Sequence, residues 1–102
     1  MANQQQYFGN TDTDVDVLEI QIPMVRVVLC NDDYTTFDFV IMILMQIFNK
    51  PEKVAQQITM SIHKTGKGVA GSYPREIAET KVSQVHEAAE AAGYPLRAII
   101  EE

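Results

Sequence analysis

The first regular element that the hydrophobic pattern predicts is a β-strand over residues 25–30. The segment is rich in β-branched side chains and apolar at successive positions, which is typical of a strand that is central in a sheet or covered on both faces. The triplet Asn31-Asp32-Asp33 ends it, because these side chains favour turns and helix caps over strand ladders. Thr35 or Thr36 then suits the N-cap of a following helix.

An unusually apolar helix is predicted next, from residue 37 to about residue 48. Every position in it is apolar except Asp38 and Gln46, so apolar side chains occupy all sides of the helix. Such a helix is either covered all round or leaves an apolar surface for a partner, and the sequence leaves both alternatives open.

Proline and glycine mark the boundaries of the elements that follow. Pro51 fits the first turn of a helix over residues 51–65, and Gly66 fits its C-cap. The Gly-rich stretch over residues 66–73 predicts a loop leading into a short strand.

A third helix is predicted between Pro74 and Gly93, with small apolar residues at helical spacing that would let it lie close against a sheet. Residues 96–100 then predict a last strand. The element order β-α-α-β-α-β predicts an α+β fold with two layers, in which a small antiparallel three-stranded sheet packs on three helices.

Length and charge divide the chain into a tail and one domain. The 102 residues, 46% of them hydrophobic, suffice for about one domain. Residues 1–23 hold Asp12, Asp14, Asp16 and Glu19 and no Lys or Arg, so they carry −4 of the net charge of −6. We therefore expect a flexible acidic tail over residues 1–22 and a folded domain over residues 23–102.

The composition also excludes several classes of partner. Nucleic acids and anionic membranes attract clustered Lys and Arg, which this acidic chain does not have, so neither is expected as a partner. The longest apolar run, residues 39–45, is far shorter than the roughly 20 residues that cross a bilayer. The single Cys30 can form neither a disulfide within the chain nor a Cys-rich zinc site, and it favours a reducing compartment.

Spacing alone reveals no catalytic or metal-binding set. Asp32 and Asp33 are adjacent, as in some acid–base or metal sites, but a turn that caps the next helix accounts for them as well. The series Asp12-x-Asp14-x-Asp16 begins like an EF-hand loop and then has Val17 where that loop needs glycine and Pro23 where it needs glutamate.

The two histidines differ in their surroundings. His63 lies beside an apolar helical stripe, where a lone histidine is usually structural, and His86 lies in a polar stretch, where we expect it to be solvated. From the residues alone, no catalytic group, no cofactor and no metal is expected.

Several separate motifs resemble the signatures of the ClpS family. They are Leu29-Cys30-Asn31-Asp32-Asp33-Tyr34-Thr35 followed by Asp38-Phe39-Val40, then Ala78-Glu79-Thr80-Lys81-Val82, and Gly93-Tyr94-Pro95-Leu96. His63 stands between them at the matching place and is followed by the Gly-rich stretch. The resemblance covers about residues 24–102 and leaves the tail out.

The resemblance implies an adaptor without catalysis of its own. Proteins of this family bind N-degron substrates that begin with Leu, Phe, Tyr or Trp, and deliver them through the N-terminal domain of a ClpA- or ClpC-like AAA+ unfoldase to the ClpP peptidase. Asn31, Asp32 and His63 would bind the α-amino group of the substrate, because an ammonium offers three hydrogen-bond donors to such acceptors. Asp33 would orient the loop.

An apolar pocket for the first side chain of the substrate is implied in the same way. Its expected lining is Leu29, Thr35, Phe37, Val40, Thr59, Ile62 and Leu96. The family usually has Met at positions 37 and 59 and Pro at 36, where this chain has Phe37, Thr59 and Thr36. Because Phe is stiffer than Met, and Thr is smaller and polar, we expect a changed or narrowed preference among first residues.

The resemblance further implies that Glu76 and Lys81, on the third predicted helix, dock the unfoldase and that the tail acts in delivery. We expect a monomer in the bacterial cytoplasm or the plastid stroma. The alternative is an interaction module of the ribosomal-stalk C-terminal-domain type, which has the same element order. Such a module would not need the Asn31-Asp32-Asp33 turn together with His63.

Overall fold

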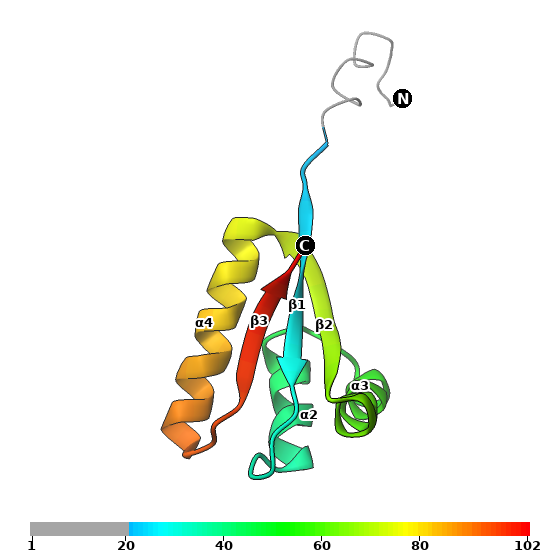
Figure 1. Cartoon of the computed structure of the whole chain (residues 1–102), viewed down its shortest axis with the longest axis vertical. Coiled ribbons are helices and arrows are strands. Elements are labelled where there is room, and N and C mark those ends of the chain that lie inside the picture. The colour runs from blue at the N-terminus through cyan, green and yellow to red at the C-terminus, as the bar shows by residue number, and fades with distance from the viewer. Residues whose placement is uncertain (1–20) are drawn as a thin grey trace, which may run out of the picture.

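The computed structural model describes residues 21–102, and the tail predicted over residues 1–22 therefore lies almost wholly outside the described residues (Figure 1). The element order is the predicted β-α-α-β-α-β. The elements are β1 (Met24–Cys30), α2 (Phe37–Gln46), α3 (Glu52–Thr65), β2 (Lys67–Pro74), α4 (Arg75–Ala92) and β3 (Arg97–Glu101).

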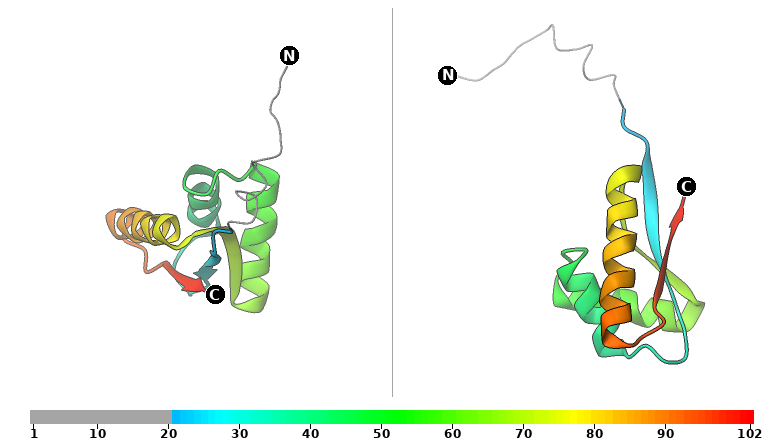
Figure 2. Two further views of the ribbon diagram at one scale, coloured as in Figure 1. Left: turned by 90° about the horizontal axis from the view of Figure 1, so that it is seen from above. Right: turned by 90° about the vertical axis from the view of Figure 1, so that its left-hand side faces the viewer.

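The described strands form one antiparallel three-stranded sheet in the order β2-β1-β3. The helices lie on one face of this sheet, with α4 beside the strands and α3 crossing at one end (Figure 2). This confirms the two-layer α+β prediction, and it confirms that the apolar strand β1 is the central one. The C-terminal end of β1, the start of α2 and the end of α3 come together at one end of the molecule (Figure 1).

Both faces of β1 are covered, by different means. Val25, Val27 and Leu29 are buried in the core between the sheet and the helices. Val28 points to the other face and is still only 2% exposed. The ion pair between Lys67 Nζ and Glu101 Oε2, at 2.6 Å, joins β2 to β3 across this face. The strand register places Lys67 and Glu101 on the same face as Val28, one toward each end of β1 from it.

α2 begins at a side-chain cap and buries one face. Thr36, one of the two predicted N-cap residues, accepts a hydrogen bond at its Oγ1 from Phe39 N at 3.1 Å. Val40, Ile43 and Leu44 are buried against the sheet. The helix ends at Gln46, two residues before the predicted end at Phe48.

The excess apolar side chains of α2 are divided between a second contact and an exposed surface. Phe39 packs on Tyr94, which follows α4, with ring centroids 4.8 Å apart. Phe37 and Met45 remain 42% and 38% exposed. The sequence left open whether this helix is covered all round or leaves an apolar surface exposed. In the structure some sides of α2 are covered and another side is exposed.

The Gly-rich stretch is a strand, and the prediction of a loop with only a short strand is wrong over most of its length. β2 takes in Lys67 to Pro74 and pairs with β1 along its length except at Ala70, where the register shifts. Gly68 is required by a close approach: a Cβ at this position would stand 2.8 Å from Ile62 Cγ1 on α3. This glycine serves close packing of strand against helix, not flexibility.

His86 is also not simply solvated, as the sequence suggested. Its Nε2 accepts a hydrogen bond of 3.0 Å from the backbone N–H of Ala98. The bond ties the edge strand β3 to α4 and satisfies a backbone donor at an edge of the sheet.

The cap of α2 gives a direct test of how this helix starts. Replacing Thr36 by alanine removes the acceptor for Phe39 N, and we expect the free energy of unfolding to fall by about 1 kcal/mol. Urea unfolding followed by circular dichroism measures it. Thr36→Ser, which keeps the hydroxyl, serves as the control, and equal losses in the two variants would contradict the cap.

Candidate functional site

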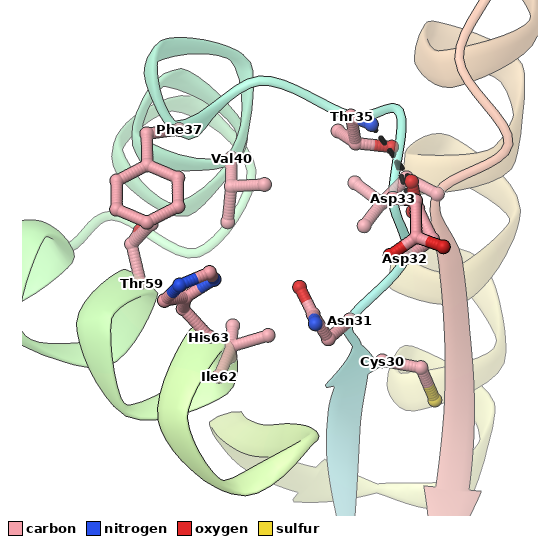
Figure 3. Close-up of a pocket in the computed structure, with 11 residues that line it drawn as sticks. Cys30, Asn31, Asp32, Asp33, Thr35, Phe37, Val40, Thr59, Ile62 and His63 are labelled. Carbon is pink, nitrogen blue, oxygen red and sulfur yellow. Dashed lines mark hydrogen bonds between the residues drawn. The ribbon is translucent and has the colours of Figure 1, made fainter.

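A pocket of about 230 Å³ opens where β1, α2, α3 and the α4–β3 connection meet. It is smaller than the roughly 300–1,000 Å³ typical of sites for drug-sized ligands, so it suits a single side chain with its backbone amine. Figure 3 shows its lining, with polar side chains from the turn after β1 facing apolar and aromatic side chains from α2 and α3. The lining residues are Cys30, Asn31, Asp32, Asp33, Thr35, Phe37, Val40, Thr59, Ile62, His63 and Leu96.

The polar side of the pocket is a turn ordered by the carboxylate of Asp32. Its Oδ1 accepts hydrogen bonds from the backbone N–H groups of Tyr34 at 2.8 Å and Thr35 at 2.7 Å. Its Oδ2 accepts one from the Thr35 hydroxyl at 2.7 Å. Partial burial acts to raise the pKa of Asp32, but the hydrogen bonds from Thr35 and Tyr34 together hold that pKa below its ordinary value of 3.8. The group is therefore a carboxylate at neutral pH.

These hydrogen bonds bear on the roles expected for the two aspartates. The resemblance to the ClpS family implied that Asp32 binds the amine and that Asp33 orients the loop. The bonds described above show that Asp32 itself orders the turn, whereas residues 21–102 provide no hydrogen bond to the Asp33 side chain. Asp33 lines the pocket and is exposed. Its orienting role remains a prediction.

A backbone hydrogen bond brings the turn next to the end of α3. Asn31 N donates to Gly66 O at 2.8 Å, and Gly66 caps α3 with a φ of 98°, a left-handed conformation that favours glycine. His63 lies in the last turn of the same helix. Asn31 and His63, distant in sequence, therefore line one pocket, and the Asn31 side chain points into it (Figure 3).

His63 also contacts Phe37, the first residue of α2. Their ring centroids are 5.1 Å apart with an interplanar angle of 69°, an edge-to-face arrangement. Because Phe37 is 42% exposed, its ring stands at the entrance of the pocket rather than within the core. Phe37, expected in the apolar part of the pocket, is thus in contact with His63, expected in the amine-binding part.

The deeper walls are apolar, including the one threonine that the sequence singled out as polar. Val40, Ile62 and Leu96 are buried. The Thr59 hydroxyl donates to Ala55 O within α3 at 2.8 Å. Because the Thr59 hydroxyl donates its hydrogen to its own helix, it has no donor left for a ligand, and the methyl branch adds to the apolar wall.

All but one of the residues expected to bind the substrate line the pocket. Leu29 is the exception: it is fully buried in the core and does not line the pocket, because strand alternation directs it between the sheet and the helices. Cys30 was not among the residues expected at the site, but it lines the rim of the pocket. Its side chain points away from the centre (Figure 3). In the sequence, only its position directly before Asn31 indicated that Cys30 lies at the pocket.

The two residues expected to dock a partner lie on α4, outside this pocket. Glu76 is exposed in the first turn of α4. Lys81 is partly buried, and its Nζ donates to Ile47 O at 2.6 Å. Within residues 21–102 no cluster of His, Cys, Asp or Glu is arranged to hold a metal ion, and no helix is long and apolar enough to cross a bilayer.

The lowered pKa of Asp32 predicts a dependence of stability on pH. A carboxyl group whose pKa is lower in the folded than in the unfolded state stabilises the fold above its unfolded pKa, and this contribution is lost as the pH falls through the folded pKa. Between about pH 5 and pH 2, Asp32→Asn should therefore show a shallower loss of unfolding free energy than the wild type. Denaturant unfolding at a series of pH values measures the difference. Asp33→Asn is the matched control, and an unchanged slope for Asp32→Asn would contradict the assignment.

Comparisons with known proteins show which family this chain is similar to. Residues 21–99 match the family model described as "ATP-dependent Clp protease adaptor protein ClpS". An ATP-dependent Clp protease adapter protein ClpS from Desulforapulum autotrophicum is 50% identical over 91 residues, which cover 89% of this chain and 88% of that protein. The protein of the same name from Desulfotalea psychrophila is 50% identical over 99 residues, covering 97% of this chain and 95% of that one.

A solved structure is similar as well. Agrobacterium tumefaciens ClpS2 bound to L-phenylalaninamide superimposes with a TM-score of 0.76 at 33% identity, covering 79% of this chain and 98% of that chain. The family-model match spans most of the described residues, and these relatives are described as adaptors and not as enzymes. On these grounds the chain belongs to the ClpS family of ATP-dependent Clp protease adaptors.

Proposed function

We propose that this chain binds the free α-amino group and the bulky hydrophobic first side chain of N-degron substrates, and delivers them to a Clp AAA+ unfoldase with its ClpP peptidase. The observation that carries the proposal is the joining of a polar, carboxylate-bearing turn and apolar walls in one pocket of about 230 Å³. A ligand that fills both parts must combine a cation with an apolar group. The L-phenylalaninamide bound to the related ClpS2 is such a molecule, with a free amine next to a phenyl side chain.

The amine would be bound by Asn31, Asp32 and His63. A carboxylate accepts about four hydrogen bonds, and the turn uses three of those positions on Asp32, which leaves capacity for an ammonium N–H. A neutral imidazole nitrogen of His63 and the amide oxygen of Asn31 supply further acceptors. Hydrogen bonds to a charged group contribute about 1.5–3 kcal/mol each.

The side chain of the first residue would enter between Phe37 and Val40 on one side and Thr59, Ile62 and Leu96 on the others. Burying a Leu or Phe side chain contributes about 1.5–3 kcal/mol, which is comparable with the amine contacts. Neither part suffices alone. An amine without a large side chain binds weakly, and a side chain without the amine does not mark a chain terminus.

Phe37 and Thr59 favour aromatic first residues over leucine. The edge-to-face contact with His63 restrains the Phe37 ring at the entrance, so it offers an incoming aromatic ring a fixed partner. Thr59 is shorter than the usual Met and turns its hydroxyl to Ala55 O, which leaves depth for a long, flat side chain. We infer a preference for Phe, Tyr and Trp over Leu.

Delivery would use surfaces outside the pocket. Glu76 is exposed on α4 and free to meet the N-terminal domain of a ClpA- or ClpC-like unfoldase. Residues 1–22, which carry −4 of the net charge of −6, are proposed to engage the unfoldase after docking, and residues 23–102 to form the substrate-binding domain of a monomeric adaptor.

Acetylation of the peptide N-terminus tests the core of the proposal. A Phe-initiated peptide with a free amine should bind about a hundredfold more tightly than the same peptide acetylated, because the neutral amide loses the charge-assisted bonds to Asn31, Asp32 and His63. Fluorescence anisotropy of the two labelled peptides measures the ratio. Equal affinities would refute the proposal and favour an interaction module of the ribosomal-stalk type.

A second measurement tests the preference for aromatic residues. Peptides differing only in residue one, Phe or Leu, are titrated against the wild type, Phe37→Met and Thr59→Met. We expect the Phe-to-Leu affinity ratio to fall by about two- to tenfold in Phe37→Met, because an aromatic pair contributes about 0.5–1.5 kcal/mol beyond its buried area. Thr59→Met should lower the same ratio by filling the pocket. Thr59→Val keeps the shape of the side chain and is the control, and unchanged ratios would contradict the preference.

A further inference from the structure

One face of the sheet is covered by none of the described helices (Figure 2). Val27 and Leu29 of β1 face the helices, so strand alternation directs Arg26, Val28 and Cys30 to the opposite side, which we call the outer face. The strand register adds their neighbours on β2 and β3 to this face. These neighbours are Lys67, Val69, Ser72, Arg97, Ile99 and Glu101.

An apolar row crosses the middle of the outer face. Val28 lies between Val69 on β2 and Ile99 on β3. Neither Val69 nor Ile99 belongs to the core between the sheet and the helices. Val69 is 44% exposed and Ile99 is half-buried. The row therefore still has apolar surface that a further segment of chain could remove from water.

The outer face is basic, although the chain as a whole is acidic. Arg26, Lys67 and Arg97 lie on it, and Glu101 is the one acidic residue among the strand residues of this face. Glu101 is shared between two cations, since Lys67 Nζ lies 2.6 Å and an Arg26 nitrogen 3.9 Å from its carboxylate oxygens. Arg97 is exposed and has no ion-pair partner within residues 21–102. The face therefore keeps a net positive charge.

The segment of residues 12–20, which we call the acidic segment, has the complementary charge. It holds four acidic side chains and no Lys or Arg. Apolar side chains stand among these acids, at Val15, Val17, Leu18 and Ile20. The acidic segment thus offers both kinds of contact that the outer face provides, a negative charge for the basic residues and apolar side chains for the row at Val28.

The acidic segment is also joined to the chain beside this face. It precedes β1, the central strand, whose first residue Met24 is on the outer face and 55% exposed. The seven residues of β1 span about 23 Å, and the nine residues of the acidic segment reach about 30 Å when extended. After a reversal at residues 21–23 the segment is long enough to lie along the whole outer face.

We propose that the acidic segment binds the outer face of its own chain. Its carboxylates would meet Arg26, Lys67 and Arg97, and its apolar side chains would cover Val69 and Ile99. Single ion pairs at a surface are weak, but a short connection gives the segment a high effective concentration at the face. The contact does not depend on the proposed function. Only its consequence does, namely that the tail is held on the domain until the unfoldase is met.

Paramagnetic broadening in NMR spectra of the full chain tests the contact. A nitroxide is attached at Thr13→Cys in the Cys30→Ser background, which leaves one thiol to label. We expect the amide signals of Val69 and Ile99 to broaden, and that of Met60, exposed on α3, to stay sharp. Raising the salt from about 0.1 M to about 1 M shortens the screening length from about 10 Å to about 3 Å and should restore the broadened signals.

A matched pair of variants tests the charges. Arg97→Gln removes an exposed cation of the outer face, and Lys53→Gln removes one from α3. We expect the broadening at Val69 and Ile99 to fall to about half in Arg97→Gln and to stay unchanged in Lys53→Gln, because only the first charge is close enough to escape screening.

The remaining outcomes all contradict the proposal. Equal broadening at Met60, or none at Val69 and Ile99, would mean that the outer face does not hold the segment. Broadening of an unlabelled ¹⁵N chain mixed with the spin-labelled chain would assign the contact to a second copy. Peptide binding enters none of these measurements, so a failure of the proposed function would leave this test intact.

Discussion

The hydrogen bond from Asn31 N to Gly66 O is the contact on which the candidate site most depends. It ties the end of the central strand to the cap of α3, and so it brings a turn and a helix end from separate parts of the chain to one pocket. The bond requires Gly66 in its left-handed conformation, and it requires β2 to leave α3 closely enough for Gly68 to pass Ile62. Moving either element would separate Asn31 from His63 and divide the polar side of the pocket.

The pocket combines a charged, polar side and an apolar side, whose physical requirements conflict. A carboxylate needs hydrogen-bonding partners to remain charged at the edge of an apolar site, and apolar walls need water to be excluded. The turn resolves the conflict locally. Thr35 and Tyr34 satisfy part of the Asp32 carboxylate, which lowers its pKa and keeps it ionised even though it is partly buried. Thr59 resolves the same conflict in the wall by turning its hydroxyl to its own helix.

Much of the fold was predictable because the hydrophobic periodicity indicates the helices and strands, and capping residues and glycines indicate where they begin and end. The apolar run of β1, the N-cap at Thr36 and the glycines that end α3 and α4 all act within a few residues of where they stand. The length of β2 was underestimated because glycine in a sequence indicates a turn, whereas the need for Gly68 comes from Ile62 on another element. The same limit applies to His86, whose partner Ala98 is brought to it only by the packing of β3 on α4.

The candidate site shows the same difference between what the sequence predicts and what depends on tertiary contacts. The resemblance to the family supplied its residues, and nearly all of them line one pocket, but it could not reveal that Leu29 points into the core. Nor could it distinguish Lys81 from Glu76, because the hydrogen bond from Lys81 to Ile47 O exists only in the folded structure. What each charge is used for depends on the tertiary contact, and Lys81 makes one whereas Glu76 is exposed.

The apolar excess of α2 follows from what the helix must contact. One side packs on the sheet through Val40, Ile43 and Leu44, and another packs on Tyr94 through Phe39. The remaining side keeps Phe37 exposed at the pocket entrance, where a water-exposed ring is a source of binding free energy once a ligand covers it. A helix with a single apolar stripe could have filled the core equally well. It would have left the pocket without the exposed ring of Phe37, so the apolar excess of α2 goes beyond what the core requires.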